Sequence, residues 1–177
     1  MRLIKEKLLG LYTKNVLKAH KIPRRNVGFK QAKLIGLLYT QEDLQKKELI
    51  QQFIDQLQAT GKTVAVLPYV ATKNQAFDEG FPGFTQHAIN YWGQLLDGQL
   101  ADFVNTAFDY LYHLDFTSDP ILDYLLAKSL AKCRVGNFDL SRANLFEIMV
   151  KCEHMEDKHA LEHLTDQMIY YTQLLGT

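Results

Sequence analysis

Polar side chains that could bind a ligand follow two apolar segments of the sequence. They carry hydroxyl, amide or carboxylate groups, and they are Thr40, Gln41, Asp115, Thr117, Ser118 and Asp119. If each apolar segment is a parallel strand, these residues lie beyond the carboxyl ends of the strands, where open α/β sheets bind ligands. A helix that begins there can hold an anion with its free N–H groups and its dipole. The pattern therefore predicts a site for a nucleotide or phosphorylated metabolite.

Helix capping is an alternative explanation for the same residues. Thr40 with Asp43 three residues later resembles a capping box, and Asp119-Pro120 is typical of a helix start. Neither turn has the glycine-rich loop of dinucleotide-binding or P-loop proteins. Arg134 is a further candidate for contact with an anion, with an acidic neighbour such as Asp139 as its other possible partner.

Catalytic and metal-binding signatures are weak. His159, Glu162 and His163 form an H-x-x-E-H pattern, but only fourteen residues follow it to supply a third ligand. We interpret these side chains as a solvated helix face and predict no metal and no cofactor. The chain has no G-x-S-x-G segment to expose a nucleophilic serine. An interaction module is therefore the first hypothesis for function, and a small enzyme or ligand binder is the second.

The charge of the chain is divided unevenly. Residues 1–33 hold ten Lys and Arg against one acid, whereas the remainder holds ten basic and nineteen acidic residues. Such a basic segment can contact an anionic partner or lie on its own acidic body. The candidates for an anionic membrane surface or an acidic partner are Lys5, Lys7, Lys14, Lys18, Arg24 and Arg25. Nucleic acid is disfavoured, because aromatic residues do not alternate with these charges.

Residues 1–18 have the pattern of an amphipathic helix. Ile4, Leu8, Leu11 and Tyr12 are expected on one side, with the lysines exposed. We divide the chain into this basic N-terminal arm, residues 1–28, and a single α/β domain, residues 29–177.

Strands and helices are expected to alternate along the domain. Strands are predicted at 34–40, 62–70, 87–92, 110–114 and 145–151. Helices are predicted from about Gln41 to Gly61, at 100–105, from Pro120 to about Cys133, and at 156–175, with 71–86 as a loop. This order predicts a three-layer Rossmann-like or flavodoxin-like α/β domain. Its sheet should be mostly parallel with about five strands, and the basic helical arm should precede it.

Composition favours a cytoplasmic protein. A structural subunit whose site forms only in a homo-oligomer is a third hypothesis for function. The only two cysteines, Cys133 and Cys152, lie in patterns typical of buried residues and lack a C-x-x-C spacing. No apolar run approaches the length that spans a bilayer, and charges interrupt the N-terminus where a signal peptide would be apolar.

The segments AKLIGLLYT, DFVNTAFDYLYHLDF and SLAKCRVGNFD resemble a small bacterial protein family of unknown function, over about Asn26 to Val150. FDYLYHLDF with the later AKCRVG is also similar to the N-terminal half of heptosyltransferase-type enzymes. That second likeness implies a Rossmann-like layer arrangement. It implies no donor site, because those enzymes enclose a nucleotide sugar between two such domains, and fold does not imply function.

Overall fold

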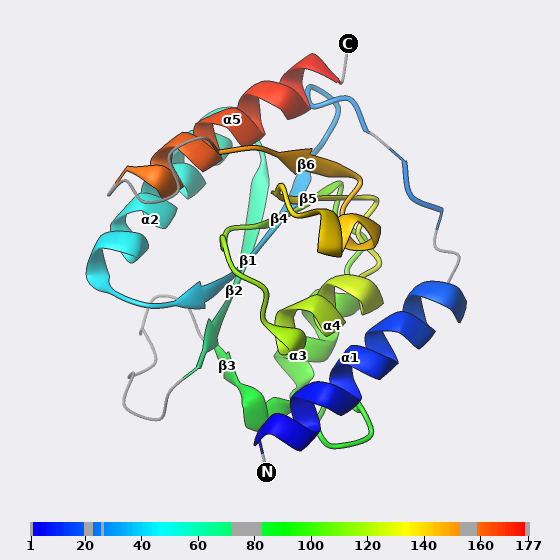
Figure 1. Ribbon diagram of the computed structural model, residues 1–177. Helices are drawn as coiled ribbons and strands as arrows, with labels where there is room; N and C mark the ends of the chain where they lie inside the picture. The colour runs from blue at the N-terminus through cyan, green and yellow to red at the C-terminus, as the bar shows by residue number, and fades with distance from the viewer. Residues whose placement is uncertain (1, 20–22, 26, 72–82, 153–158, 176–177) are drawn as a thin grey trace.

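The computed structural model describes residues 2–19, 23–25, 27–71, 83–152 and 159–175, and six parallel strands form its centre (Figure 1). The strands are β1 (Leu34–Gln41), β2 (Thr63–Val70), β3 (Phe84–Thr85), β4 (Tyr110–His113), β5 (Cys133–Asn137) and β6 (Ile148–Val150). Their order in the sheet is β3-β2-β1-β4-β5-β6, and each neighbouring pair is parallel. The predicted Rossmann-like α/β class is confirmed.

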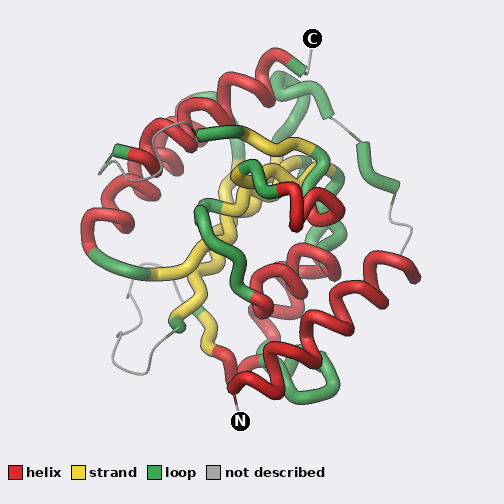
Figure 2. Tube along the Cα trace, in the orientation of Figure 1, coloured by secondary structure: helices red, strands yellow, loops and turns green. Residues whose placement is uncertain are grey.

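Helices cover both faces of this sheet (Figures 1 and 2). They are α1 (Arg2–Ala19), α2 (Leu44–Ala59), α3 (Gly98–Asn105), α4 (Pro120–Lys128) and α5 (Ala160–Leu174), with short 3-10 helices η1 (Gln86–Ala88) and η2 (Leu140–Leu145). One core lies between the sheet and α2 with α5, and the other between the sheet and α3 with α4. The predicted N-terminal helix, α1, is present and packs on the outside of α4.

Strand β4 shows why two cores form. Successive side chains of a strand point to opposite faces, so Tyr110 and Tyr112 enter the α2–α5 core while Leu111 enters the α4 core. Tyr112 packs edge-on against Phe53 of α2, with ring centroids 5.5 Å apart. A continuous apolar run buried on both faces is typical of a central parallel strand, and the prediction for this segment is confirmed.

Strand β5 was not predicted, and the helix before it is shorter than expected. The spacing of Leu126, Ser129, Leu130 and Cys133 extends the helical pattern past Lys128, but Ser129 leaves helical geometry with ψ at 137°. Cys133 then begins the strand that pairs with β4. Within β5, a Cβ on Gly136 would lie 2.4 Å from the Phe146 ring, so only glycine allows this ring to pack on the sheet.

The prediction of a strand at 87–92 is wrong. Residues 86–88 are a 3-10 helix, and Ile89 forms only an isolated antiparallel bridge with Leu95. The Asn90 side chain accepts hydrogen bonds from the backbone N–H groups of Trp92 and Gln94, which closes a turn in place of a strand. Phe84, expected in a loop, lies in β3. Thr85 is the other residue of β3, Gln86 begins η1, and residues 72–82 of the predicted loop fall outside the described residues.

The last two elements are confirmed with narrower bounds. The strand predicted at 145–151 is β6, three residues long, because η2 continues to Leu145. The helix predicted at 156–175 is α5, which begins at Ala160, and its expected start falls in the segment 153–158, outside the described residues. Its buried residues include Leu161, Leu164 and Met168, as the helical spacing indicated.

Candidate functional site

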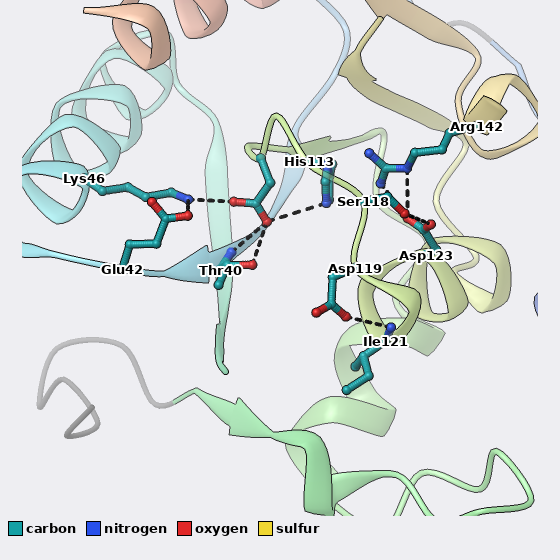
Figure 3. Close-up of polar contacts among 10 residues, drawn as sticks. Thr40, Glu42, Lys46, His113, Ser118, Asp119, Ile121, Asp123 and Arg142 are labelled. Atoms are coloured by element: carbon teal, nitrogen blue, oxygen red, sulfur yellow. Dashed lines mark hydrogen bonds and ion pairs between the residues drawn. The ribbon is translucent and has the colours of Figure 1, made fainter. Parts of the chain in front are cut away.

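Asp115 follows β4 and lies where the strand order reverses, between the carboxyl ends of β1 and β4. Figure 3 shows Thr40 of β1 and Lys46 of α2, which both contact it. Its Oδ2 accepts hydrogen bonds from Thr40 N, at 2.8 Å, and Thr40 Oγ1, at 2.9 Å. Its Oδ1 accepts from Lys46 Nζ of α2, at 2.6 Å. The sequence placed Thr40 and Asp115 at the same edge, and the structure brings them into contact. The carboxylate therefore joins β1, β4 and α2 at this edge of the sheet.

The capping box predicted at Thr40 is wrong, because Thr40 and Gln41 both belong to β1. Asp43 is the N-cap of α2, and its carboxylate accepts from Lys46 N at 2.8 Å. Asp119 caps α4 as expected, accepting from Ile121 N at 2.8 Å. Helices α2 and α4 are thus each capped by a carboxylate, which leaves less positive potential for an anionic ligand at these two helix starts. Helix α5, whose start lies beside the start of α2, has no side-chain cap at His159.

Ser118 belongs to a second polar network beside the start of α4. Its Oγ donates to Asp123 Oδ2 at 2.7 Å, and the guanidinium of Arg142 donates to Asp123 Oδ1 from Nε and Nη2 at 3.0 and 2.5 Å. The Arg142 side chain is buried and lies over the Phe146 ring. Sequence reasoning missed Asp123 and Arg142, because no local pattern pairs residues on α4 and η2.

His113 lies between these two networks and is fully buried. Its Nε2 is 3.7 Å from Asp115 Oδ2, beyond hydrogen-bond distance, and neither ring nitrogen has a hydrogen-bond partner among the described residues. Burial lowers the pKa of His113 to about 4; Asp115 opposes this shift, and Arg142 and Lys46 add to it. The imidazole is therefore neutral at pH 7. The sequence analysis did not single out His113, and a histidine inside an apolar strand is the signal that could have identified it.

This burial predicts a specific loss of stability in acid. The unfolded chain protonates His113 near pH 6.5 and the folded chain only near 4, so the free energy of unfolding falls as pH drops through that window. In His113→Leu this contribution is absent. Between pH 7 and 4.5, the free energy of unfolding measured with urea should therefore fall by about 2 to 3 kcal/mol less in the variant than in wild type. Equal losses in the two proteins would contradict the prediction.

Arg134, another predicted ligand-binding residue, is not part of this group. It is the second residue of β5, level with Leu111, and its guanidinium forms an ion pair with Glu147 at 2.7 Å. The acidic partner suggested from the sequence was Asp139, whose carboxylate instead caps η2.

An open pocket of about 280 Å³ lies beside the Asp115–Lys46 pair, on the α2–α5 side of the sheet edge. Thr117 lines it, as the only predicted site residue to do so. The other lining residues come from the start of α2, the end of β4 and the start of α5: Glu42, Asp43, Gln45, Lys46, Leu49, Leu114, Phe116, Ala160 and Leu161.

The basic arm packs on its own domain. Leu9 is fully buried against the α4 core, and Lys5 donates through Nζ to the carbonyl oxygens of Gln86 and Ile89. Burial lowers the pKa of Lys5. The Arg24 guanidinium donates to Ala131 O, and burial, with Arg134 nearby, lowers its pKa to about 10.

The orientation predicted for this helix is therefore wrong. Lys5 is inside, while Ile4 and Leu11 point away from the domain and are 62% and 57% exposed. Lys5, Leu9 and Thr13, each four residues apart, form the buried side, because the carbonyl oxygens around Ile89 accept the lysine. Lys7, Lys14 and Lys18 are exposed as expected, and so is Arg25.

The H-x-x-E-H pattern lies at the start of α5, where His159 Nδ1 contacts Glu162 Oε2 at 3.1 Å. Within the ranges described above, no group of three or more His, Cys, Asp or Glu side chains could hold a metal ion. No helix in the same ranges combines the length and apolarity that a membrane span requires.

A family model described as "Family of unknown function (DUF6913)" matches residues 5–175. Neither the curated proteins nor the solved structures contain a significant match.

Proposed function

Because the chain belongs to the DUF6913 family, whose function is unknown, we propose its role from the structure: the protein is an interaction module that docks on an anionic membrane surface through α1. The observation that carries the proposal is the outward side of this helix, which combines three exposed apolar residues with three exposed lysines. We call this side the outer face, and it consists of Leu3, Ile4, Lys7, Leu11, Lys14 and Lys18.

Helix α1 is apolar on two sides, but the domain covers only one. Positions three, four and seven apart share a helix face, which separates the outer face from the buried side around Leu9. Leu3 and Ile4 are 72% and 62% exposed. A helix that is apolar on both sides is normally covered on both, so a second partner is expected above Leu3, Ile4 and Leu11. Figure 1 shows α1 on the outside of the molecule, with α4 on its inner side.

The charge of the outer face indicates the kind of partner. Lys7, Lys14 and Lys18 lie between or beside the exposed apolar residues, an arrangement typical of helices that lie in the plane of an anionic membrane. The 90–93 turn adds an aromatic residue near the helix: Trp92 is 75% exposed, and its neighbour Gly93 lies against Tyr12 of α1. Tryptophan favours the headgroup region of bilayers.

Other partners fit the outer face less well. In a symmetric pair of two copies, the same lysines would face one another, and like charges at close range oppose association. Nucleic acid would leave Leu3, Ile4 and Leu11 without a suitable contact. An acidic protein remains the competing partner, and vesicle binding distinguishes it from a membrane.

Neutralising the three lysines should nearly abolish membrane binding. Each lysine near an anionic surface contributes about 1 kcal/mol, so Lys7→Gln, Lys14→Gln and Lys18→Gln together should weaken binding roughly 100-fold. The measurement is co-sedimentation with phosphatidylcholine vesicles that contain 30% phosphatidylserine (a chosen composition of roughly physiological charge), at low and moderate salt. Wild type should bind these vesicles, and more strongly at low salt.

A matched control changes the same number of charges elsewhere. Lys30, Lys47 and Lys151 are also exposed, and their replacement by Gln should leave binding within about threefold of wild type. The pair Ile4→Ser and Leu11→Ser should also lose binding, because it removes apolar side chains that would enter the bilayer. Wild type that stays in solution with anionic vesicles, or equal binding by the two lysine variants, would refute the membrane proposal.

The cytoplasmic setting belongs to the same proposal. Cys133 and Cys152 are both free and buried, which supports a reducing compartment, and the cytoplasmic leaflet is the anionic one. Bacterial origin and the likeness to heptosyltransferase-type enzymes remain predictions from the sequence, and neither contributes to the docking surface.

A further inference from the structure

The hairpin of residues 88–96 lies beside α1, and we propose that it is a second membrane anchor, which inserts Trp92 and Leu96 into the bilayer. This inference rests on the proposed docking of α1 and specifies how the membrane is held. Trp92 and Leu96 are 75% and 64% exposed. No residue from Ala88 to Leu96 has a charged side chain, so the hairpin can enter the membrane interface without burying a charge.

Hydrogen bonds hold the hairpin in one shape. Near its base, Leu96 N donates to Ala88 O at 2.7 Å. At its tip, the hydroxyl of Tyr124, a residue of α4, donates to Gly93 O at 2.6 Å. Backbone groups that are already paired need no water, which lowers the cost of placing the hairpin in a membrane interface.

Helix α1 and the hairpin are in direct contact. Lys5 of α1 donates through Nζ to Ile89 O, and the same ammonium lies 6.0 Å from the centre of the Tyr91 ring. Two turns farther along α1, the Tyr12 ring packs against the tip, where it would lie 3.3 Å from a Cβ on Gly93. Figure 1 shows this loop, in green before α3, beside α1 at the margin of the molecule.

These contacts place the hairpin next to the outer face of α1. Residues four apart on a helix share one side, so Ile4, Leu8 and Tyr12 form one row. Ile4 belongs to the outer face, whereas Leu8 and Tyr12 are half-buried. The row therefore leads from the exposed surface to the hairpin. A bilayer that covers Ile4 and Leu11 also borders the hairpin.

The two anchors hold the membrane by different interactions. The lysines of the outer face attract anionic headgroups, and salt screens that attraction. Trp92 and Leu96 are uncharged, and tryptophan favours the headgroup region of bilayers. Their contribution is therefore expected to persist when the salt concentration is raised.

The fluorescence of Trp92 tests the insertion directly, because it is the only tryptophan of the chain. The wild-type protein would be titrated with the same anionic vesicles, with and without lipids brominated in the acyl chain. Its emission is expected to shift to shorter wavelength, and the brominated lipids are expected to quench it. Unshifted and unquenched emission, under conditions in which the protein co-sediments with the vesicles, would overturn the inference and leave the docking of α1 intact. Failure to co-sediment at all would refute both.

A pair of matched variants measures what the hairpin contributes. Trp92→Ser with Leu96→Ser should weaken co-sedimentation at moderate salt by about 10-fold or more, because it removes the apolar side chains that enter the bilayer. Tyr170→Ser with Leu44→Ser also removes one exposed aromatic residue and one exposed leucine, but from α5 and α2 on the opposite side of the sheet. This control should bind as wild type does. Equal binding by the two double variants would overturn the inference.

Discussion

Asp115→Ala is expected to lower the free energy of unfolding by about 3 kcal/mol, because it removes the carboxylate that joins β1, β4 and α2. In the native protein Asp115 is 4% exposed, and its carboxylate accepts hydrogen bonds from Thr40 N, Thr40 Oγ1 and Lys46 Nζ. Alanine leaves the Thr40 N–H without its acceptor and leaves Lys46, itself mostly buried, with Glu42 as its remaining ion-pair partner. Urea unfolding at pH 7 measures the effect.

Glu42→Ala is the control for this substitution. It removes the other carboxylate that contacts Lys46, but Glu42 is 60% exposed, and ion pairs at such positions contribute at most about 1 kcal/mol. Asp115→Asn should fall between the two, because the amide oxygen can still accept from Thr40. If Asp115→Ala loses no more stability than Glu42→Ala, then Asp115 is not the link between these elements.

Arg134→Met should lower the free energy of unfolding by about 3 to 5 kcal/mol, because it leaves a partly buried carboxylate without its cation. Arg134 is 3% exposed, and its guanidinium contacts Glu147 from Nε at 3.0 Å and from Nη2 at 2.7 Å. It also donates to the carbonyl oxygens of Leu126 and Asn144. Arg134→Lys should also be strongly destabilised, since an ammonium cannot reproduce this fork of donors.

The double variant Arg134→Met, Glu147→Leu separates the two sources of this loss. If most of the loss comes from the isolated Glu147 carboxylate, the double variant should be more stable than Arg134→Met alone, in the same urea measurement. A loss below about 1 kcal/mol in Arg134→Met would show that the pair is dispensable. These substitutions lie away from the outer face of α1, so the variants that still fold should bind vesicles as wild type does.

The layered α/β arrangement could be predicted from the sequence, because local patterns encode it. The apolar runs that begin at Leu34, Thr63 and Tyr110 became parallel strands, and Asp119 and Pro120 opened a helix. Strand β5 was missed because residues 129–133 continue the helical spacing of α4. Only the pairing of Cys133–Val135 with β4 makes this segment a strand, and that pairing is not local.

For the candidate sites, too, some features follow from the local sequence and others depend on the tertiary structure. The sequence alone determined that Thr40 and Asp115 would share one edge, since the carboxyl ends of parallel strands lie together. It also determined the charge of the arm and the free, buried state of both cysteines. The tertiary structure decided that Asp115 pairs with Lys46, that Arg134 pairs with Glu147, and that Lys5 faces inward while Leu11 faces outward. Periodicity indicates only on which face of a helix or strand a residue lies, or that it lies at the end of one. The partner of a charged side chain depends instead on which distant segment comes within about 3 Å of it when the chain folds.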